Sequence, residues 1–442
     1  MINEGPSLRS VTISRRGADR VRAGHVWVYR SDVIDAKDVP PGATVTVQEL
    51  SHRRIRSTPA RPPRALGSAL YSTASEIALR MISTKPVNDL EQLMRQRMRE
   101  AIAYRERFVK DTNAYRVVFS EGDFLPGLIV DRYNDILSLQ VLTQAMDAAA
   151  LREVFLSELQ HALNPAVIVE RVDPRVRRLE QLPEKESGVV WGDPLASDSM
   201  AESGATGVSP IQRDPAKNAP EAGRGRPGPH KTSTEFEMNG VRFLFGALGG
   251  QKTGAFLDQR ENYAVAAQYA RGEALDVFCY QGGFALHLAK VCDKVTGVDS
   301  SRPALETAEQ NAALNRRDIE WIEANAFDLL RDYSDQGRQY DCIVLDPPAF
   351  AKSRQNLSTA LRGYKELNLR ALKMLRPGGI LVTCSCSYHL SPTDLIGVVQ
   401  AAGLDSHRIL RILENRGQAK DHPTVFGIPE TAYLKCLILV VS

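Results

Sequence analysis

ALDVFCYQGGF, residues 274–284, is the stretch that decides the fold of this 442-residue chain. It begins as an apolar run typical of a buried β-strand, turns at Gly282 and Gly283, and continues into a predicted helix. Glycines in such a turn let a ligand approach the backbone beside a helix N-terminus. Taken alone the signal is weak, because the spacing is not G-x-G-x-x-G and many α/β turns carry glycine.

Strand-like and helix-like segments alternate from residue 236 onward. We predict strands at 274–278, 295–298, 319–322, 341–345 and 380–383. We predict helices between them at 284–291, 303–315 and 359–375. This alternation is typical of α/β proteins with a parallel, doubly wound sheet, so we expect that fold over residues 236–442.

Polar residues follow the second and third predicted strands, where open α/β sheets bind their ligands. Asp299 lies about twenty residues beyond the glycine turn, where an acid can accept both ribose hydroxyls of an adenosine ligand. A helix N-cap before Pro303 is the alternative interpretation of Asp299. Asn325 and Ala326 follow the third strand and can frame an adenine edge. Together these features favour S-adenosylmethionine over a nicotinamide dinucleotide, which would leave the downstream thiol and acid unexplained.

Two further segments follow predicted strands, DPPAF at 346–350 and TCSCS at 383–387. An amine can take an electrophilic methyl group directly, but C5 of cytosine needs a thiolate to add to C6 first. An acid facing N3 of the ring assists that addition. We predict Cys386 as the nucleophile, with Cys384 as second choice, and Asp346 as the acid. The other four cysteines (279, 292, 342 and 436) are expected to be small core residues.

The N-terminal half has two smaller patterns and an irregular segment. Short strands over residues 8–83 indicate a small β-barrel, while helices at 88–110 and 146–163 among short strands indicate an α+β unit. Residues 194–235 are rich in Ser, Ala, Gly and Pro and almost free of large apolar groups, so we predict a disordered insertion. The predicted parts are 1–83, 84–193, 194–235 and 236–442.

Charge and composition narrow the function classes. Residues 1–83 hold thirteen Lys and Arg against seven Asp and Glu, although the net charge of the chain is only +3. This asymmetry suits a phosphate-bearing partner, or else a solvated basic face. No apolar stretch reaches eighteen residues and no signal-peptide layout occurs, so we expect no membrane span. The cysteines lack metal-ligand spacing, so we expect no metal. The Cys384-x-Cys386 pair is too close for a relaxed structural disulfide, which favours a reducing cytoplasm.

Motifs of one known family occur along nearly the whole chain. They are GGQKTGAFLDQREN at 249–262, D-x-F-x-Y-x-G-G-F at 276–284, DPPAF with Lys352, SCS at 385–387, RAGHVWVY at 22–29 and LPGLIVDRY at 125–133. The chain thereby resembles the bacterial large-subunit ribosomal RNA cytosine-5 methyltransferases that contain a PUA domain. Three stretches depart from that family: residues 50–66 do not resemble its barrel strands, the 194–235 insertion is foreign to it, and Asn325 replaces its usual Asp.

The resemblance implies a PUA domain over 1–83, a central α+β domain over 84–193 and a Rossmann-like methyltransferase domain over 236–442. It implies ribosomal RNA as the partner, is compatible with a homodimer, and favours Cys386 over Cys384 because the family's nucleophile lies in the SCS segment. The cofactor contacts that we predict are Gln259, Arg260, Phe278, Tyr280, Gly282, Asp299, Asn325, Ala326 and Asp346.

Two other functions fit parts of the sequence. A DPPAF segment also suits methylation of an exocyclic amine, in which the Pro-Pro backbone accepts hydrogen bonds from the amine and no cysteine is required. A barrel with a basic segment also suits an RNA-binding protein that does not catalyse, although the acid, the thiol and the glycine turn argue against it.

Overall fold

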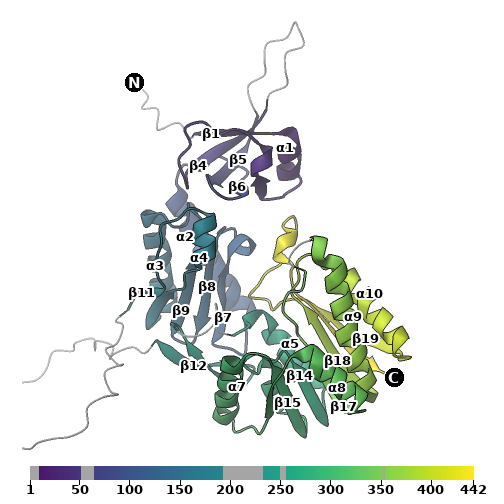
Figure 1. Cartoon of the computed structure of the whole chain (residues 1–442). Coiled ribbons are helices and arrows are strands. Elements are labelled where there is room, and N and C mark those ends of the chain that lie inside the picture. The colour runs from purple at the N-terminus through teal and green to yellow at the C-terminus, as the bar shows by residue number, and fades with distance from the viewer. Residues whose placement is uncertain (1–8, 51–63, 193–231, 249–254, 352–353) are drawn as a thin grey trace, which may run out of the picture.

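The computed structural model describes residues 9–50, 64–192, 232–248, 255–351 and 354–442, and these form three sheets and one hairpin (Figure 1). Most of the predicted insertion, and residues 51–63 of the atypical 50–66 stretch, lie outside the described residues. Strand β12 begins at Ser233, so residues 233–235 form a strand rather than the end of a disordered segment.

The N-terminal domain is built on a six-stranded mixed sheet. Its strand order is β2 (Trp27–Tyr29), β6 (Ile77–Ser83), β5 (Arg64–Tyr71), β4 (Thr44–Glu49), β1 (Ser10–Ile13) and β3 (Val33–Asp35). The short strands predicted over residues 8–83 are confirmed. Helix α1 (Arg15–Arg22) was not predicted, because its polar sequence carries no apolar stripe. Ala18 and Val21 of this helix pack on the N-terminal core, and buried Asp32 pairs with Arg16 and Arg20.

The central domain is the predicted α+β unit. Its sheet runs β11 (Gly188–Trp191), β10 (Val167–Glu170), β9 (Ile136–Val141), β8 (Leu128–Tyr133) and β7 (Ala114–Phe119). Helices α2 (Leu90–Phe108) and α3 (Ala149–Leu163) confirm the two predicted helices, and the short helix α4 (Pro174–Leu179) follows β10. Met94, Met98 and Phe155 from α2 and α3 pack with Val130 and Leu139 of the sheet in one apolar core.

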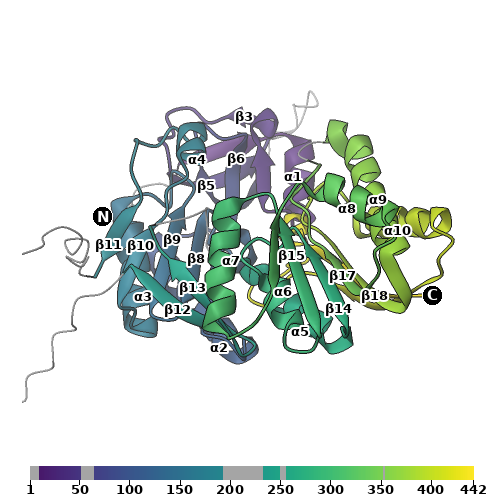
Figure 2. The same cartoon turned by 60° about the horizontal axis from the view of Figure 1, so that its bottom comes forward.

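The C-terminal domain has the predicted doubly wound sheet, with helices beside it (Figure 2). One strand of this sheet is reversed. The strand order is β16 (Glu320–Glu323), β15 (Lys294–Asp299), β14 (Glu273–Val277), β17 (Tyr340–Leu345), β18 (Leu375–Ser385), β20 (Lys435–Val441) and β19 (Leu410–Arg416). Strands β14 to β18 pair in parallel, whereas β20 is antiparallel to both neighbours. The sequence pattern did not predict β19 or β20.

Helices cover both faces of this sheet. One core holds buried residues of α5 (Arg260–Tyr269), α6 (Gly283–Leu288) and α7 (Arg302–Leu314), and of the hairpin β12–β13 (Ser233–Met238, Val241–Gly246). The other holds residues of α8 (Ala326–Asp335), α9 (Leu357–Met374) and α10 (Pro392–Asp405). None of the described helices is both long and apolar enough to cross a membrane.

A buried carboxylate, Asp421, fastens the central domain to the C-terminal domain. It lies between β19 and β20, where it accepts the backbone N–H of Arg116 at 2.8 Å and the guanidinium of Arg260 at 3.2 Å. Its main-chain carbonyl accepts from buried Arg105 on α2 at 2.7 Å. Burial alone would raise the pKa of Asp421, but attraction to His422 and Arg260 outweighs burial and lowers the pKa to about 2.

We expect Asp421→Ala to cost about 3–5 kcal/mol of unfolding free energy, because it leaves Arg260 buried without its carboxylate. The folded pKa of Asp421 is depressed, so its contribution should be complete above the unfolded value of about 3.9 and lost as pH falls toward the folded value. Urea unfolding followed by circular dichroism measures both effects. Asp328→Ala, which breaks an exposed pair with Arg331, is the control and should cost under about 1 kcal/mol. Equal losses in the two variants would contradict this role of Asp421.

Candidate active site

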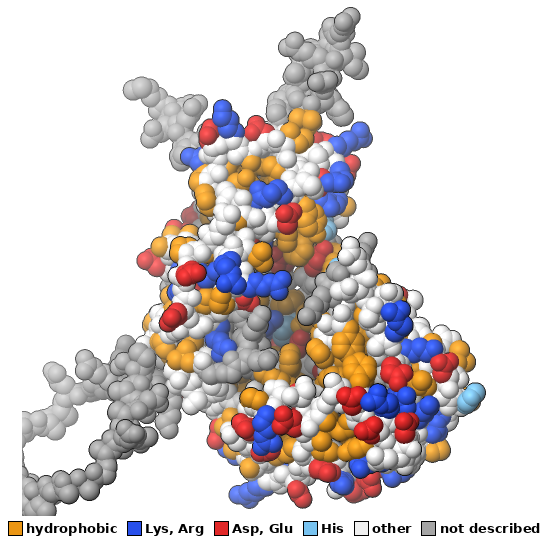
Figure 3. Space-filling view, viewed as in Figure 1, with side chains coloured by type: hydrophobic (Ala, Val, Ile, Leu, Met, Phe, Trp, Pro, Cys, Tyr) orange, Lys and Arg blue, Asp and Glu red, His pale blue; other side chains and the backbone are white. Residues whose placement is uncertain are grey.

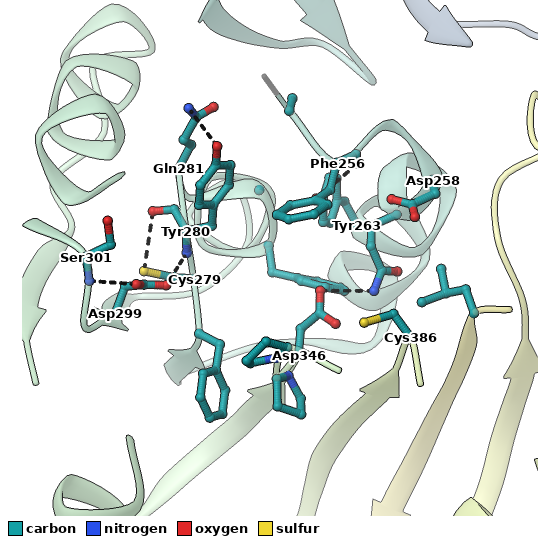
Figure 4. A pocket seen from close by; sticks show the side chains of 18 of the residues that line it. Phe256, Asp258, Tyr263, Cys279, Tyr280, Gln281, Asp299, Ser301, Asp346 and Cys386 are labelled. Carbon is teal, nitrogen blue, oxygen red and sulfur yellow. Dashed lines mark hydrogen bonds between the residues drawn. The ribbon is translucent and has the colours of Figure 1, made fainter. Parts of the chain in front are cut away.

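A cavity of about 370 Å³ opens beyond the carboxyl ends of β14, β15, β17 and β18 (Figure 4). The glycine turn, the end of β15 and the Asp346-Pro347-Pro348 segment line it, together with Cys386 and Leu434. Asp258, Gln259 and Tyr263 close another side. The described lining contains three carboxyl groups and no Lys or Arg, so its chemistry suits a cationic ligand better than a phosphate.

The glycine turn is strained and tightly packed. Phe278 and Tyr280 adopt positive φ values of 67° and 51°, a conformation that costs energy for non-glycine residues and is concentrated at functional sites. The backbone N–H of Phe278 donates to Val298 on β15 at 2.9 Å. At Gly282, where φ is 84°, a Cβ would lie 2.8 Å from the Trp321 ring, so only glycine fits.

Asp299 fixes this turn from the neighbouring strand. One carboxylate oxygen accepts the N–H of Tyr280 at 2.9 Å and the other accepts the N–H of Ser301 at 2.9 Å. Ser301, not Asp299, occupies the N-cap position of α7. A carboxylate can accept about four hydrogen bonds, so Asp299 keeps acceptor capacity at the cavity.

Asp276 lies buried behind the turn and accepts the N–H of Ala285 at 2.8 Å. Its other oxygen has no hydrogen-bond partner among the described residues. Burial raises the pKa of Asp276 to about 8 against the effect of that N–H, and the charges of Asp346 and Asp299 add to the rise. The region beneath the cavity therefore resists further negative charge.

Asp346 follows β17 and meets Gln259 from the segment before α5. Its Oδ2 accepts from the Gln259 amide at 3.0 Å, and Asn262 donates to the other end of that amide at 2.7 Å, which fixes its orientation. Burial and the neighbouring Asp258 raise the pKa of Asp346 to about 7, with Gln259 acting in the opposite direction. A carboxyl group with this pKa can hold and release a proton near neutral pH.

The two cysteines of the TCSCS segment occupy different environments. Strand β18 ends at Ser385, so Cys386 leaves the sheet and lines the cavity while partly exposed. Cys384 lies opposite Cys436 across the strand pair, fully buried in the core. Cys342 and Cys436 are core residues as predicted, Cys279 is buried at the cavity wall, and Cys292 is only partly buried.

Side chains that sequence reasoning missed hold the Cys386 turn. Tyr364 on α9 hydrogen-bonds to the hydroxyls of Ser385 at 2.8 Å and Ser387 at 3.1 Å. The buried ammonium of Lys435 donates to the carbonyl of Ser387 at 2.7 Å. A lysine directly before the apolar run of β20 was a usable signal, but nothing in the sequence marked Tyr364.

Burial, together with the charges of Asp346 and Asp258, raises the pKa of the Cys386 thiol to about 11, and Lys435 acts in the opposite direction. Burial in turn lowers the pKa of Lys435. The carboxylates of the cavity and the ammonium of Lys435 therefore shift the pKa of the Cys386 thiol in opposite directions.

The predicted site residues divide into two groups. Those that line the cavity are Gln259, Phe278, Tyr280, Asp299, Asp346 and Cys386. Gly282 caps α6 beside it, Arg260 is committed to Asp421, and Ala326 starts α8 outside the lining. Asn325 caps α8 by accepting the N–H of Phe327 at 2.9 Å. Residues 249–254 and Lys352 lie outside the described residues. The contacts of the predicted residues to a cofactor stay predictions.

No three His, Cys, Asp or Glu side chains of the described residues are grouped to hold a metal ion.

Lys435→Met should raise the pKa of the Cys386 thiol, because it removes the positive charge that favours the thiolate. Alkylation of Cys386 by iodoacetamide at about pH 9, followed by mass spectrometry, should therefore be slower than in the parent. Lys435→Arg keeps the charge and should stay closer to the parent. Lys365→Met, which breaks an exposed pair with Asp405, is the matched control. An unchanged or faster rate in Lys435→Met would contradict the electrostatic role of this lysine.

Comparison with known proteins agrees with this architecture. Residues 217–438 match the family of S-adenosylmethionine-dependent methyltransferases, and residues 11–55 match the PUA-like domain. A SAM-dependent methyltransferase from Streptococcus mutans has the same fold, with a TM-score of 0.73 and 16% identity over 98% of this chain and 100% of that chain.

Curated relatives are similar over nearly the whole length. Ribosomal RNA large subunit methyltransferase I of Tolumonas auensis is 34% identical over 423 residues, which cover 94% of this chain and 95% of the relative. The protein of the same name from Vibrio cholerae is 32% identical over 431 residues, 95% and 96% of the two chains. The Rossmann-like fold, the PUA-like domain and the S-adenosylmethionine cofactor that we predicted are confirmed. The chain belongs to the S-adenosylmethionine-dependent methyltransferases, in the PUA-containing family of the ribosomal RNA large subunit methyltransferases I.

Proposed function

We propose that this enzyme methylates C5 of a cytosine in ribosomal RNA through a covalent bond between Cys386 and C6 of the base. The observation that carries the proposal is the joint placement of Cys386 and Asp346 in one cavity with the glycine turn, while Cys384 lies in the core. Ribosomal RNA as the substrate comes from the names of the relatives. The hollow between the C-terminal domain and the other two, with Lys and Arg side chains beside it, is compatible with an RNA strand (Figure 3).

The cavity suits the cofactor in charge and shape. S-adenosylmethionine supplies an electrophilic methyl group on a positively charged sulfur. The carboxyl groups of Asp258, Asp299 and Asp346 favour such a cation, and Asp299 retains acceptors for ribose hydroxyls. The glycine turn permits close approach of the ligand to the backbone, since Gly282 and Gly283 present no side chain.

The residues of the chain divide the chemistry between them. The Cys386 thiolate adds to C6 while Asp346 gives a proton to N3, which places the displaced electron pair on C5. C5 then bonds to the methyl carbon, while the bond from that carbon to the positively charged sulfur breaks and leaves its electron pair on the sulfur. Afterwards a base removes the C5 proton. The carboxylate of Asp258, which also lines the cavity, is the candidate for this base. The electron pair of the broken C5–H bond restores the C5–C6 double bond, the pair of the C6–S bond leaves with the sulfur of Cys386 as thiolate, and N3 returns its proton to Asp346.

The raised pKa of Asp346 supports its role, because a carboxyl group with a pKa near 7 carries a proton in a useful fraction of molecules at neutral pH. The Tyr364 and Lys435 contacts hold the Cys386 turn so that the sulfur stays at the cavity. The target base must leave any stack to reach this sulfur, so an unpaired or flipped cytosine is the substrate we expect.

Asp299→Ala should weaken the binding of S-adenosylmethionine by about 1.5–3 kcal/mol, the usual size for hydrogen bonds to a charged group. The loss has two sources, the ribose acceptor and the support of the Tyr280 N–H. Isothermal calorimetry with the cofactor alone measures it. Asp328→Ala, on the surface of α8, should bind like the parent. Parent-like affinity in Asp299→Ala would refute the assignment of this acid.

RNA carrying 5-fluorocytosine should trap the parent enzyme as a covalent adduct, because fluorine at C5 cannot leave as a proton does. Cys386→Ala should form no adduct, whereas Cys384→Ala should still form one. Asp346→Asn keeps the side-chain volume but cannot donate a carboxyl proton, so it should slow trapping far more than it weakens cofactor binding. Denaturing gel electrophoresis with labelled RNA detects the adduct.

Each other outcome has a distinct meaning. An adduct lost in Cys384→Ala but kept in Cys386→Ala would reverse the roles of the two thiols. Methyl transfer to RNA by Cys386→Ala, without an adduct in the parent, would favour methylation of an exocyclic amine.

A further inference from the structure

A short turn between β19 and β20 presents an aromatic side chain to solvent. The Phe426 side chain is 103% exposed, while the next most exposed large apolar residue in the described chain, Leu404, is 71% exposed. Single exposed apolar side chains are common on protein surfaces. The construction and position of this turn set Phe426 apart from such cases.

The turn around Phe426 is braced from within. Val425 bridges to buried Ile428, and its N–H donates to the hydroxyl of buried Thr431 at 2.9 Å. That hydroxyl donates to the carbonyl of Ile428 at 2.7 Å. The amide of Gln418 donates to the carbonyl of Thr431 at 2.6 Å. The neighbours of Phe426 are thus anchored, and the backbone conformation holds its ring outward.

The same turn lies between the rim of the cavity and the PUA-like domain. Glu430 accepts from the hydroxyl of Tyr388, two residues after Cys386, at 3.3 Å. The same carboxylate oxygen lies 3.3 Å from Nε2 of His25 in the N-terminal domain. Gly427 abuts Gly24, since a Cβ there would lie 3.0 Å from the Gly24 carbonyl oxygen. In Figure 1 this yellow segment extends from the C-terminal sheet toward the N-terminal domain.

We propose that Phe426 stacks on an RNA base close to the target cytosine and replaces the stacking that is lost when that cytosine enters the cavity. The inference rests on the proposed function, in which an RNA base must leave its stack to reach Cys386. Every base has a π-face, so an aromatic ring can stack on it without reading sequence, and apolar wedges of this kind support unstacked conformations. An exposed ring on an anchored turn, in the segment that contacts both Tyr388 and the PUA-like domain, suits that task.

The test measures binding rather than turnover, with the full chain and two probes. One probe is an in-vitro transcript of large-subunit ribosomal RNA; the other is a single-stranded oligonucleotide with 2-aminopurine next to a cytosine. Phe426→Ala should bind the transcript about 5- to 150-fold more weakly, the range for one base–aromatic stack. Phe426→Trp should restore affinity, and Phe426→Leu should not. Quenching of 2-aminopurine by the parent and by Phe426→Trp, but not by Phe426→Ala, reports the stack itself.

Controls separate this inference from folding and from the proposed function. Leu404→Ala on α10 should leave RNA affinity unchanged, and all variants should keep the parent's melting temperature and cofactor affinity. RNA affinity equal to that of the parent, in either Phe426→Ala or Phe426→Leu, would overturn the stacking role. If the parent forms no 5-fluorocytosine adduct while its RNA affinity still depends on the ring of Phe426, the cytosine-5 mechanism fails and the stacking role stands.

Discussion

The register of the parallel sheet is the constraint on which the whole site depends. Val298, Val277, Leu345 and Thr383 lie in one row across β15, β14, β17 and β18. The residues that follow in each strand therefore reach the same edge together. Asp299 and Asp346 come one position after the row, and Cys386 comes three positions after it. A shift of one residue in any strand pair would turn these side chains to the other face of the sheet.

This edge gathers several carboxyl groups, of which Asp276 is buried and Asp346 partly buried. Burial raises the pKa of Asp276 to about 8 and that of Asp346 to about 7, so the protein without ligand pays an electrostatic cost. A cationic ligand favours ionised carboxylates and therefore lowers that cost. Burial and the carboxylates of this cavity raise the pKa of the Cys386 thiol, so the nucleophile that we propose stays protonated until a proton acceptor takes its proton.

The segment between β19 and β20 contacts the cavity, the central domain and the PUA-like domain. At its base Asp421 binds Arg116 and Arg260, and Tyr433 donates to Asp258 at 2.6 Å, so the central domain and the cavity share one buried network. At its tip Glu430 and Gly427 lie against His25 and Gly24 of the PUA-like domain. Arg260, predicted as a cofactor contact, belongs to this network through Asp421, and its contact to the cofactor stays a prediction.

The sequence by itself determined the features that are local in the chain. A run of apolar residues followed by glycine, acid or thiol marks both a strand and the group at its end, so the doubly wound fold, the glycine turn, Asp299, Asp346 and the SCS segment were all predictable. Tertiary structure decided what depends on partners distant in the chain. Cys386 faces the cavity and Cys384 the core because β18 stops at Ser385 and β20 inserts in reverse beside it. Tyr364, Lys435 and Asp421 gain their roles only when α9, β20 and the central domain pack together, and no periodicity of hydrophobic residues encodes such contacts.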